Sequence, residues 1–196
     1  MSKMPSAWVA KNSLAFLTEC CLPICSGIAL IRKGQVAEGM ALVERGTAVW
    51  EQGGGRVSIP YSNSVLAEGM AQLDHLDDAL VVIDEVIAQI KRPGWEERHY
   101  YAEALRIKGR LLARKGDSEA AERSYIASLD WARQQQAKSW ELRTATSYAR
   151  LMRDQGRVGE AHDLLAPVYG WFTEGFGTKD LKEAKALLDE LCDYYH

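Results

Sequence analysis

The sequence predicts an all-α protein, a right-handed α-solenoid of about four similar helix pairs with a capping helix at each end. A short turn motif recurs along the chain at spacings of 40, 42 and 40 residues. Small and large apolar side chains then recur at fixed distances from that turn in every copy, as expected when one structural unit is repeated. The composition agrees, because Ala, Leu, Glu, Arg and Gln favour helix and the chain has only 5 prolines.

Four columns of apolar residues define the repeat around its turn residues, which are Gly34, Asp74, Gly116 and Gly156. Small residues occur seven positions before the turn and five after it: Gly27, Ala67, Gly109 and Ala149, then Gly39, Ala79, Ala121 and Ala161. Large residues occur four before and nine after: Leu30, Met70, Leu112 and Met152, then Val43, Ile83, Tyr125 and Leu165. Small residues let two helices cross closely while large ones fill the space beside the crossing. A turn glycine supplies the left-handed backbone that ends a helix.

The repeat assigns the whole chain, residues 1–196, to one domain. The expected helices are an N-terminal helix at 6–20, four pairs at 22–51, 60–91, 96–136 and 139–170, and a capping helix at 179–194. The glycine run 53–55 is expected to be a flexible linker, and Pro93 with Gly94 a turn. In the last helix Leu181, Ala184, Leu187, Leu188 and Leu191 form one apolar stripe.

Charge and cysteine content exclude several classes of protein. The net charge of -3 is not that of a general nucleic-acid binder, which is usually basic. Four cysteines are too few and too unevenly spaced for a disulfide framework, so we expect a reducing, cytoplasmic location. The longest apolar stretch is too short to span a membrane, which takes about 18 residues or more.

The columns resemble those of the tetratricopeptide repeat, most clearly in the third pair, where Gly109, Leu112, Gly116, Ala121 and Tyr125 fall on signature positions. The period of 40–42 is longer than the usual 34 of that family. Residues 14–191 are similar to the C-terminal repeat region of large bacterial signalling ATPases linked to adenylate or guanylate cyclase. The segments that carry this second resemblance are 105–112, 139–147 and 164–176. It implies a role in signal transduction and brings no catalytic residues.

The motifs of common catalytic and cofactor sites are missing from the sequence. The glycine run is followed by Arg56 and not by the Lys-Ser or Lys-Thr of a nucleotide-binding loop. Cys20, Cys21 and Cys25 have no second pair of ligands nearby, and we interpret them as buried helix residues that pack as small apolar groups. We therefore expect no enzyme activity, no cofactor and no metal.

One predicted helix face is rich in arginine. On the first helices of the third and fourth pairs, six arginines lie on the side turned away from the apolar columns, where a tetratricopeptide array has its concave groove. We call this set the arginine face: Arg106, Arg110, Arg114, Arg143, Arg150 and Arg153. Residues 102–157 hold twelve Lys or Arg against seven Asp or Glu. Such a stripe is either a solvated surface with local pairs, such as Glu103 with Arg106, or a groove that recognises anions.

Three functions remain open at this point. The arginine face binds an acidic segment or a free carboxylate of a protein partner. Alternatively, the module senses a small anionic ligand and passes the signal to a cyclase or ATPase. In the third hypothesis the chain is structural and forms a homodimer through its end helices.

Overall fold

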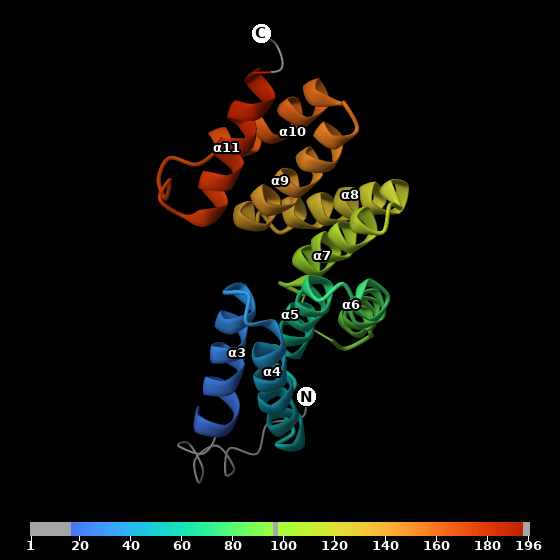
Figure 1. The fold of residues 1–196 in the computed structure, drawn as a ribbon, viewed down its shortest axis with the longest axis vertical. Helices are drawn as coiled ribbons and strands as arrows, with labels where there is room; N and C mark the ends of the chain where they lie inside the picture. Colours follow the sequence, from blue (N-terminus) through green and yellow to red (C-terminus); the bar gives the residue numbers. More distant parts are fainter. Residues whose placement is uncertain (1–16, 96–97, 194–196) are drawn as a thin grey trace. The chain divides into compact units, whose positions relative to one another are not determined.

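The computed structural model describes residues 17–95 and 98–193. The elements in those ranges are helices that follow one another along the chain, with no strand among them (Figure 1). The chain divides into two compact units, Met1–Glu97 and Arg98–His196. We call them the first unit and the second unit. The predicted fold class, an all-α helical repeat, is confirmed. No helix in the described ranges is long and apolar enough to cross a membrane.

The first unit contains two helix pairs. A π-helical turn, η1 (Leu17–Cys21), leads into α3 (Leu22–Arg32), which packs against α4 (Val36–Gln52). The second pair is α5 (Ile59–Gln72) with α6 (Leu76–Lys91), and α5 also packs on α3 and α4. Most of the N-terminal helix expected at 6–20 lies outside the described residues. The remainder, from Leu17 onward, forms η1.

The second unit contains two more pairs and one further helix. The pairs are α7 (Tyr101–Arg114) with α8 (Ser118–Gln134), and α9 (Lys138–Asp154) with α10 (Val158–Gly170). The last helix, α11 (Lys179–Asp193), packs on α9 and α10 with its five predicted apolar residues buried. Helix α7 was expected from residue 96 but begins at Tyr101, after a turn in which the Tyr101 N–H donates to the Arg98 carbonyl.

The same turn ends the first helix of every pair. Gly34, Gly116 and Gly156 adopt the predicted left-handed backbone, with φ of 87°, 87° and 78°, and Asp74 adopts it too, with φ of 66°. In each copy the N–H after the turn residue donates to the carbonyl of the large residue four positions before it, at Leu30, Met70, Leu112 and Met152. These bonds satisfy carbonyls that a helix end would leave unpaired. The repeat therefore predicted the position of the turn in every copy, and its glycines predicted the conformation in three of the four.

The small columns lie at close helix crossings. A Cβ added to Gly27 would lie 2.5 Å from the Gly39 carbonyl oxygen, and one added to Gly39 would lie 2.6 Å from that of Gly27. A Cβ on Gly109 would lie 2.7 Å from the Tyr125 ring. The alanines of both columns are fully buried, as are Val43, Ile83 and Leu165 of the second large column. The predicted pattern is confirmed as the packing pattern of both units.

The glycine run differs from its prediction as a flexible linker. Gly54 is left-handed, with φ of 79°, and the Gly55 N–H donates to the Trp50 carbonyl at 2.9 Å, so the run caps α4. Gly55 also lies against the Trp50 ring, where an added Cβ would be only 2.2 Å away. The indole N–H of Trp50 donates to the Val57 carbonyl at 2.8 Å. The segment is thus an ordered cap, because an aromatic ring and a hydrogen bond hold it.

Candidate functional site

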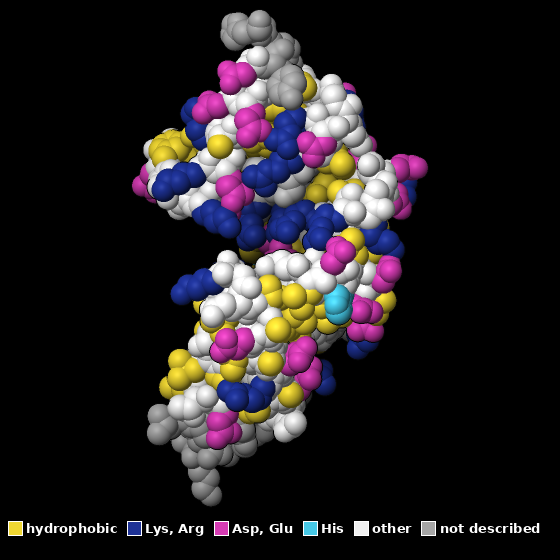
Figure 2. All heavy atoms as spheres, viewed as in Figure 1, with side chains coloured by type: hydrophobic (Ala, Val, Ile, Leu, Met, Phe, Trp, Pro, Cys, Tyr) yellow, Lys and Arg dark blue, Asp and Glu magenta, His cyan; other side chains and the backbone are white. Residues whose placement is uncertain are grey.

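The arginine face lies in the second unit, on α7 and α9, which pack against each other. Figure 2 shows Lys and Arg side chains gathered over this part of the unit, with Asp and Glu side chains beside them. The two helices run in the same direction, because Glu103 pairs with Arg143 and, further along both helices, Arg106 donates to Ser147. A buried hydroxyl, that of Ser128 on α8, bonds the Ala102 carbonyl at 2.6 Å and the Thr144 hydroxyl at 2.8 Å. It therefore fixes α7 and α9 to α8.

Arg106 was expected on the open face of α7 but is buried, with a side chain only 4% exposed. Its Nε and Nη2 donate to the two carboxylate oxygens of Glu103, each at 2.8 Å, and the Glu103 side chain is 6% exposed. Every residue from 102 to 107 is buried, because this end of α7 packs against α8 and α9. The local pair considered from sequence therefore exists, as a buried two-bond ion pair.

Arg143 connects this pair to the surface. Its Nη2 lies 2.8 Å from Oε1 of Glu103, and its Nε lies 3.9 Å from Asp180 of α11. The guanidinium also sits over the Trp140 ring, 5.3 Å from its centroid. A planar cation held by a carboxylate and an aromatic face has little freedom to move. Arg143 is 28% exposed, so one side of it remains open to solvent.

Several guanidinium groups shift the pKa values of two buried side chains in the second unit. Burial alone would raise the pKa of Glu103, but the charge and hydrogen bonds of Arg106, followed by the charges of Arg143 and Arg110, hold that pKa below its ordinary value. Burial raises the pKa of Tyr125 to about 12 against the opposing charges of Arg106, Arg110 and Arg150. Arginines from both helices thus act on the same two buried groups.

The remaining arginines of α9 face the last helix. Arg150 Nη2 lies 3.1 Å from Glu183, and Arg153 Nη1 lies 2.5 Å from Glu190. Burial would raise the pKa of Glu183, but Arg150 and then Lys179 lower it below its ordinary value. Successive pairs advance together along both helices, so α11 runs parallel to α9 with its carboxylates beside the arginines. Arg150 and Arg153 are 42% and 27% exposed.

Arg110 and Arg114 of α7 are exposed and lie one and two turns beyond the buried Arg106. They continue the row from Arg106 toward the C-terminal end of α7. The structure therefore brings the six predicted arginines onto two neighbouring helices, and they differ in exposure. One is buried, Arg106; three are partly exposed, Arg143, Arg150 and Arg153; and two are exposed, Arg110 and Arg114.

The carboxylates of α11 were missed by the sequence reasoning. Asp180, Glu183 and Glu190 flank the apolar stripe that packs α11 on α9 and α10, so the stripe itself places them beside the arginines of α9. A signal was present, since residues one and two positions from an apolar stripe lie at its border. We expected α11 only to cover the end of the repeat.

The arrangement suits the binding of carboxylates, since it consists of planar cations on a fixed helical surface. In residues 17–95 and 98–193 no three His, Cys, Asp or Glu side chains are grouped so that they could hold a metal ion. Of the clustered cysteines, Cys20 is buried as expected, and burial raises its pKa to about 11. The expectation of burial was wrong for Cys25, which is exposed because it lies on the side of α3 turned away from α4.

Comparison with known proteins supports the fold. No protein-family model matches the sequence, and no curated protein matches it. Among solved structures, the chain is similar to a putative kinesin light chain of Podosopora anserina with nearly identical TPR-like repeats. The TM-score is 0.60 and the sequence identity 18%, and the match covers 87% of this chain and 84% of that one. A single-substitution variant of that protein gives a TM-score of 0.62 at 17% identity, with the same coverage. At this identity the likeness concerns the helical-repeat fold.

Proposed function

We propose that this chain is a non-catalytic protein-interaction module whose second unit binds an acidic segment of a partner protein across α7 and α9. The observation that carries the proposal is the row of ion pairs between α9 and α11. There, three carboxylates on one helix meet three arginines on another, within the same chain. The arginine face is therefore compatible in spacing with carboxylates presented by a helix that runs alongside it.

The partner would approach from the side of α7. Helix α11 packs on α9 and α10 and supplies carboxylates to α9. The exposed Arg110 and Arg114 lie on α7, so carboxylates of a partner that reach these two groups need not displace α11. The buried Glu103–Arg106 pair would serve as the support that fixes the helix and its neighbour Arg143, not as a contact for the partner.

The binding free energy of each arginine–carboxylate contact is limited because these arginines are exposed to solvent. An exposed ion pair contributes about 0.2–1 kcal/mol, so several carboxylates are needed for measurable affinity. The interaction should weaken as salt rises, since ionic screening acts strongly on exposed charges. Charge complementarity at exposed positions speeds association and selects acidic partners more than it adds affinity.

A labelled peptide tests the proposal. Fluorescein-labelled deca-glutamate is titrated with the chain at low salt, and anisotropy gives the dissociation constant. Arg110→Glu with Arg114→Glu should weaken binding by about tenfold or more, because each change replaces an attraction with a repulsion. Arg123→Glu with Lys182→Glu is the matched control, since both residues are exposed and lie on α8 and α11. Equal loss in the two double variants would contradict the proposed location, and circular dichroism verifies that each variant is folded.

The cellular setting is a further part of the proposal. The resemblance of segments 105–112, 139–147 and 164–176 to cyclase-linked signalling ATPases supports a role in bacterial, cytoplasmic signal transduction. A reading frame for such an ATPase or cyclase, joined to or beside the gene for this chain, is expected. A neighbourhood of unrelated genes in several genomes would count against this setting.

Dimerisation through the end helices is the competing structural role. The outward residues of α11 include Lys182, Lys185 and Asp189, all exposed, which is typical of a helix that caps a repeat array in solvent. We therefore favour the capping role for α11. Light scattering at high protein concentration tests it, and a dimer that is lost when these residues are changed would contradict it.

A further inference from the structure

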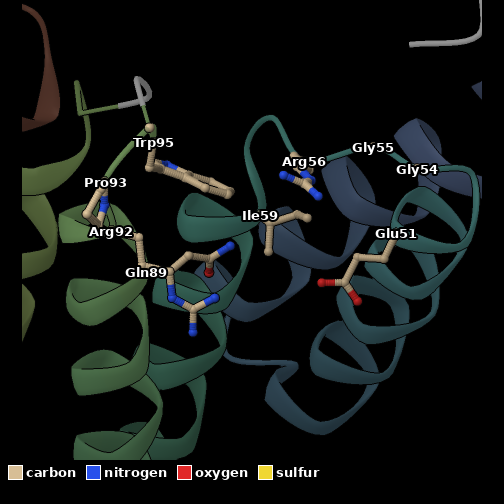
Figure 3. A pocket seen from close by; sticks show the side chains of 10 residues that line it. Glu51, Gly54, Gly55, Arg56, Ile59, Gln89, Arg92, Pro93 and Trp95 are labelled. Carbon is tan, nitrogen blue, oxygen red and sulfur yellow. The ribbon is translucent and has the colours of Figure 1, made fainter. Parts of the chain in front are cut away.

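A cavity of about 570 Å³ lies in the first unit, where the C-terminal end of α4, the start of α5 and the turn after α6 meet (Figure 3). Its volume is in the range of small-molecule sites. Glu51, Arg56 and Ile59 line one part, and Gln89, Arg92 and Trp95 line the other. All of these residues belong to the first unit, whereas the arginine face belongs to the second.

Two turns fix the walls of this cavity. The cap of α4 at Gly54 and Gly55 is held against Trp50, as described above. On the other side, the Trp95 N–H donates to the Arg92 carbonyl at 3.1 Å across Pro93 and Gly94, and Gly94 has φ of 80°. Proline followed by a left-handed glycine forms a well-defined turn. Backbone hydrogen bonds therefore hold the turn on each side of the cavity.

Two arginines supply hydrogen-bond donors to the lining of the cavity, and a tryptophan supplies a ring. Within the described ranges, neither Arg56 nor Arg92 forms an ion pair, and Figure 3 shows them on different sides of the space. The indole N–H of Trp95 is buried and meets no hydrogen-bond acceptor among the residues that the structure describes. Because that N–H is closed to water, Trp95 would offer a ligand the surface of its ring, and the N–H signal would report that contact. The start of α5 adds the partial positive charge of a helix N-terminus.

We propose that this cavity binds a small organic anion, a carboxylate or phosphate monoester attached to an aromatic ring. The anionic group would lie between Arg56 and Arg92, since guanidinium groups suit both kinds of oxyanion. The ring would lie along the indole of Trp95 and Ile59, and Glu51 and Gln89 would accept hydrogen bonds from polar groups of the ligand. This site goes beyond the proposed peptide binding and does not depend on it.

Nuclear magnetic resonance of the indole N–H groups tests the site on the intact chain. The Trp95 signal is assigned by its loss in Trp95→Phe, and phenyl phosphate and benzoate are titrated as separate probes. At least one of them should shift the Trp95 N–H signal in a saturable way, and which one does so identifies the phosphate or the carboxylate as the preferred group. Phenol, which has the ring without the charge, should not. Shifts by phenol equal to those by the anions, or no shift with either anion, would overturn the proposal.

Three variants then test the assigned roles. Arg56→Ala and Arg92→Ala should each raise the dissociation constant of the bound probe about tenfold or more, because each removes a charged hydrogen bond. Arg45→Ala is the matched control, an exposed arginine of α4 outside the cavity, and should leave binding unchanged. If Arg45→Ala weakens binding as much as the cavity variants do, the anion is held by general surface charge and the proposal fails.

Discussion

Replacing Glu103 with glutamine should destabilise the second unit far more than any exposed substitution on it. The change removes the carboxylate that compensates the Arg106 guanidinium, whose side chain is 4% exposed, and it removes one partner of Arg143. Removing one member of a buried ion pair costs about 3–5 kcal/mol, because the remaining charge is neither hydrated nor fully compensated. That is a large share of the roughly 5–15 kcal/mol that holds a typical domain folded.

Native-state hydrogen exchange of the α7 and α9 amides measures this loss within the second unit itself. Glu119→Gln is the matched control, because Glu119 is 86% exposed in its pair with Arg123 and its loss should cost less than about 1 kcal/mol. Glu103→Leu with Arg106→Met should recover much of the stability, since apolar residues of similar size can replace a buried pair. The reasoning would be refuted if Glu103→Gln cost no more than the control, or if the double variant were as unstable as Glu103→Gln.

Three other predictions concern stability. Asp74→Gly should raise the free energy of unfolding by up to about 1 kcal/mol, and Gly116→Ala should lower it by about 1–2 kcal/mol, because both positions are left-handed. Thermal unfolding measures both changes, and opposite signs would contradict the role of the turn. Gly27→Ala should cost about 1–3 kcal/mol in urea denaturation, since its Cβ would lie 2.5 Å from a carbonyl oxygen, and a neutral effect would contradict the close crossing. The pKa of Glu103 is lowered in the folded state, so the stabilisation that its carboxylate provides is present above its unfolded pKa and is lost as pH falls through the folded pKa. The difference in free energy of unfolding between wild type and Glu103→Gln should therefore disappear below about pH 4. A difference that stays constant with pH would contradict the ion pair.

The sequence predicted the repeat well because its signals are local. A left-handed turn residue needs Gly or a tolerant Asp, and a close crossing needs a small side chain at a fixed distance from it. Both conditions leave marks that recur with the period. The degenerate copy at Asp74 keeps the same turn, since the backbone there is left-handed despite the absence of glycine.

The surface was harder to predict because its signals are not local. Arg106 looked exposed by helical spacing, yet it is buried, because α9 covers the face of α7 on which it lies. Whether a charged side chain meets a partner depends on the neighbouring helix, and that helix can be far away in sequence. The pairing of Arg153 with Glu190, 37 positions further along, is such a case. The cavity in the first unit likewise requires two turns that are distant in sequence to meet.

The most direct test of acidic-segment binding follows the arginine side chains themselves. The Nε–H signals of the arginines are assigned in labelled protein, and unlabelled deca-glutamate is added at low salt. Arg110 and Arg114 should shift first and saturate together, with smaller changes at Arg150 and none at Arg123 of α8. Equal shifts at every exposed arginine of both units, or shifts confined to Arg56 and Arg92, would contradict an acidic-segment site on α7 and α9.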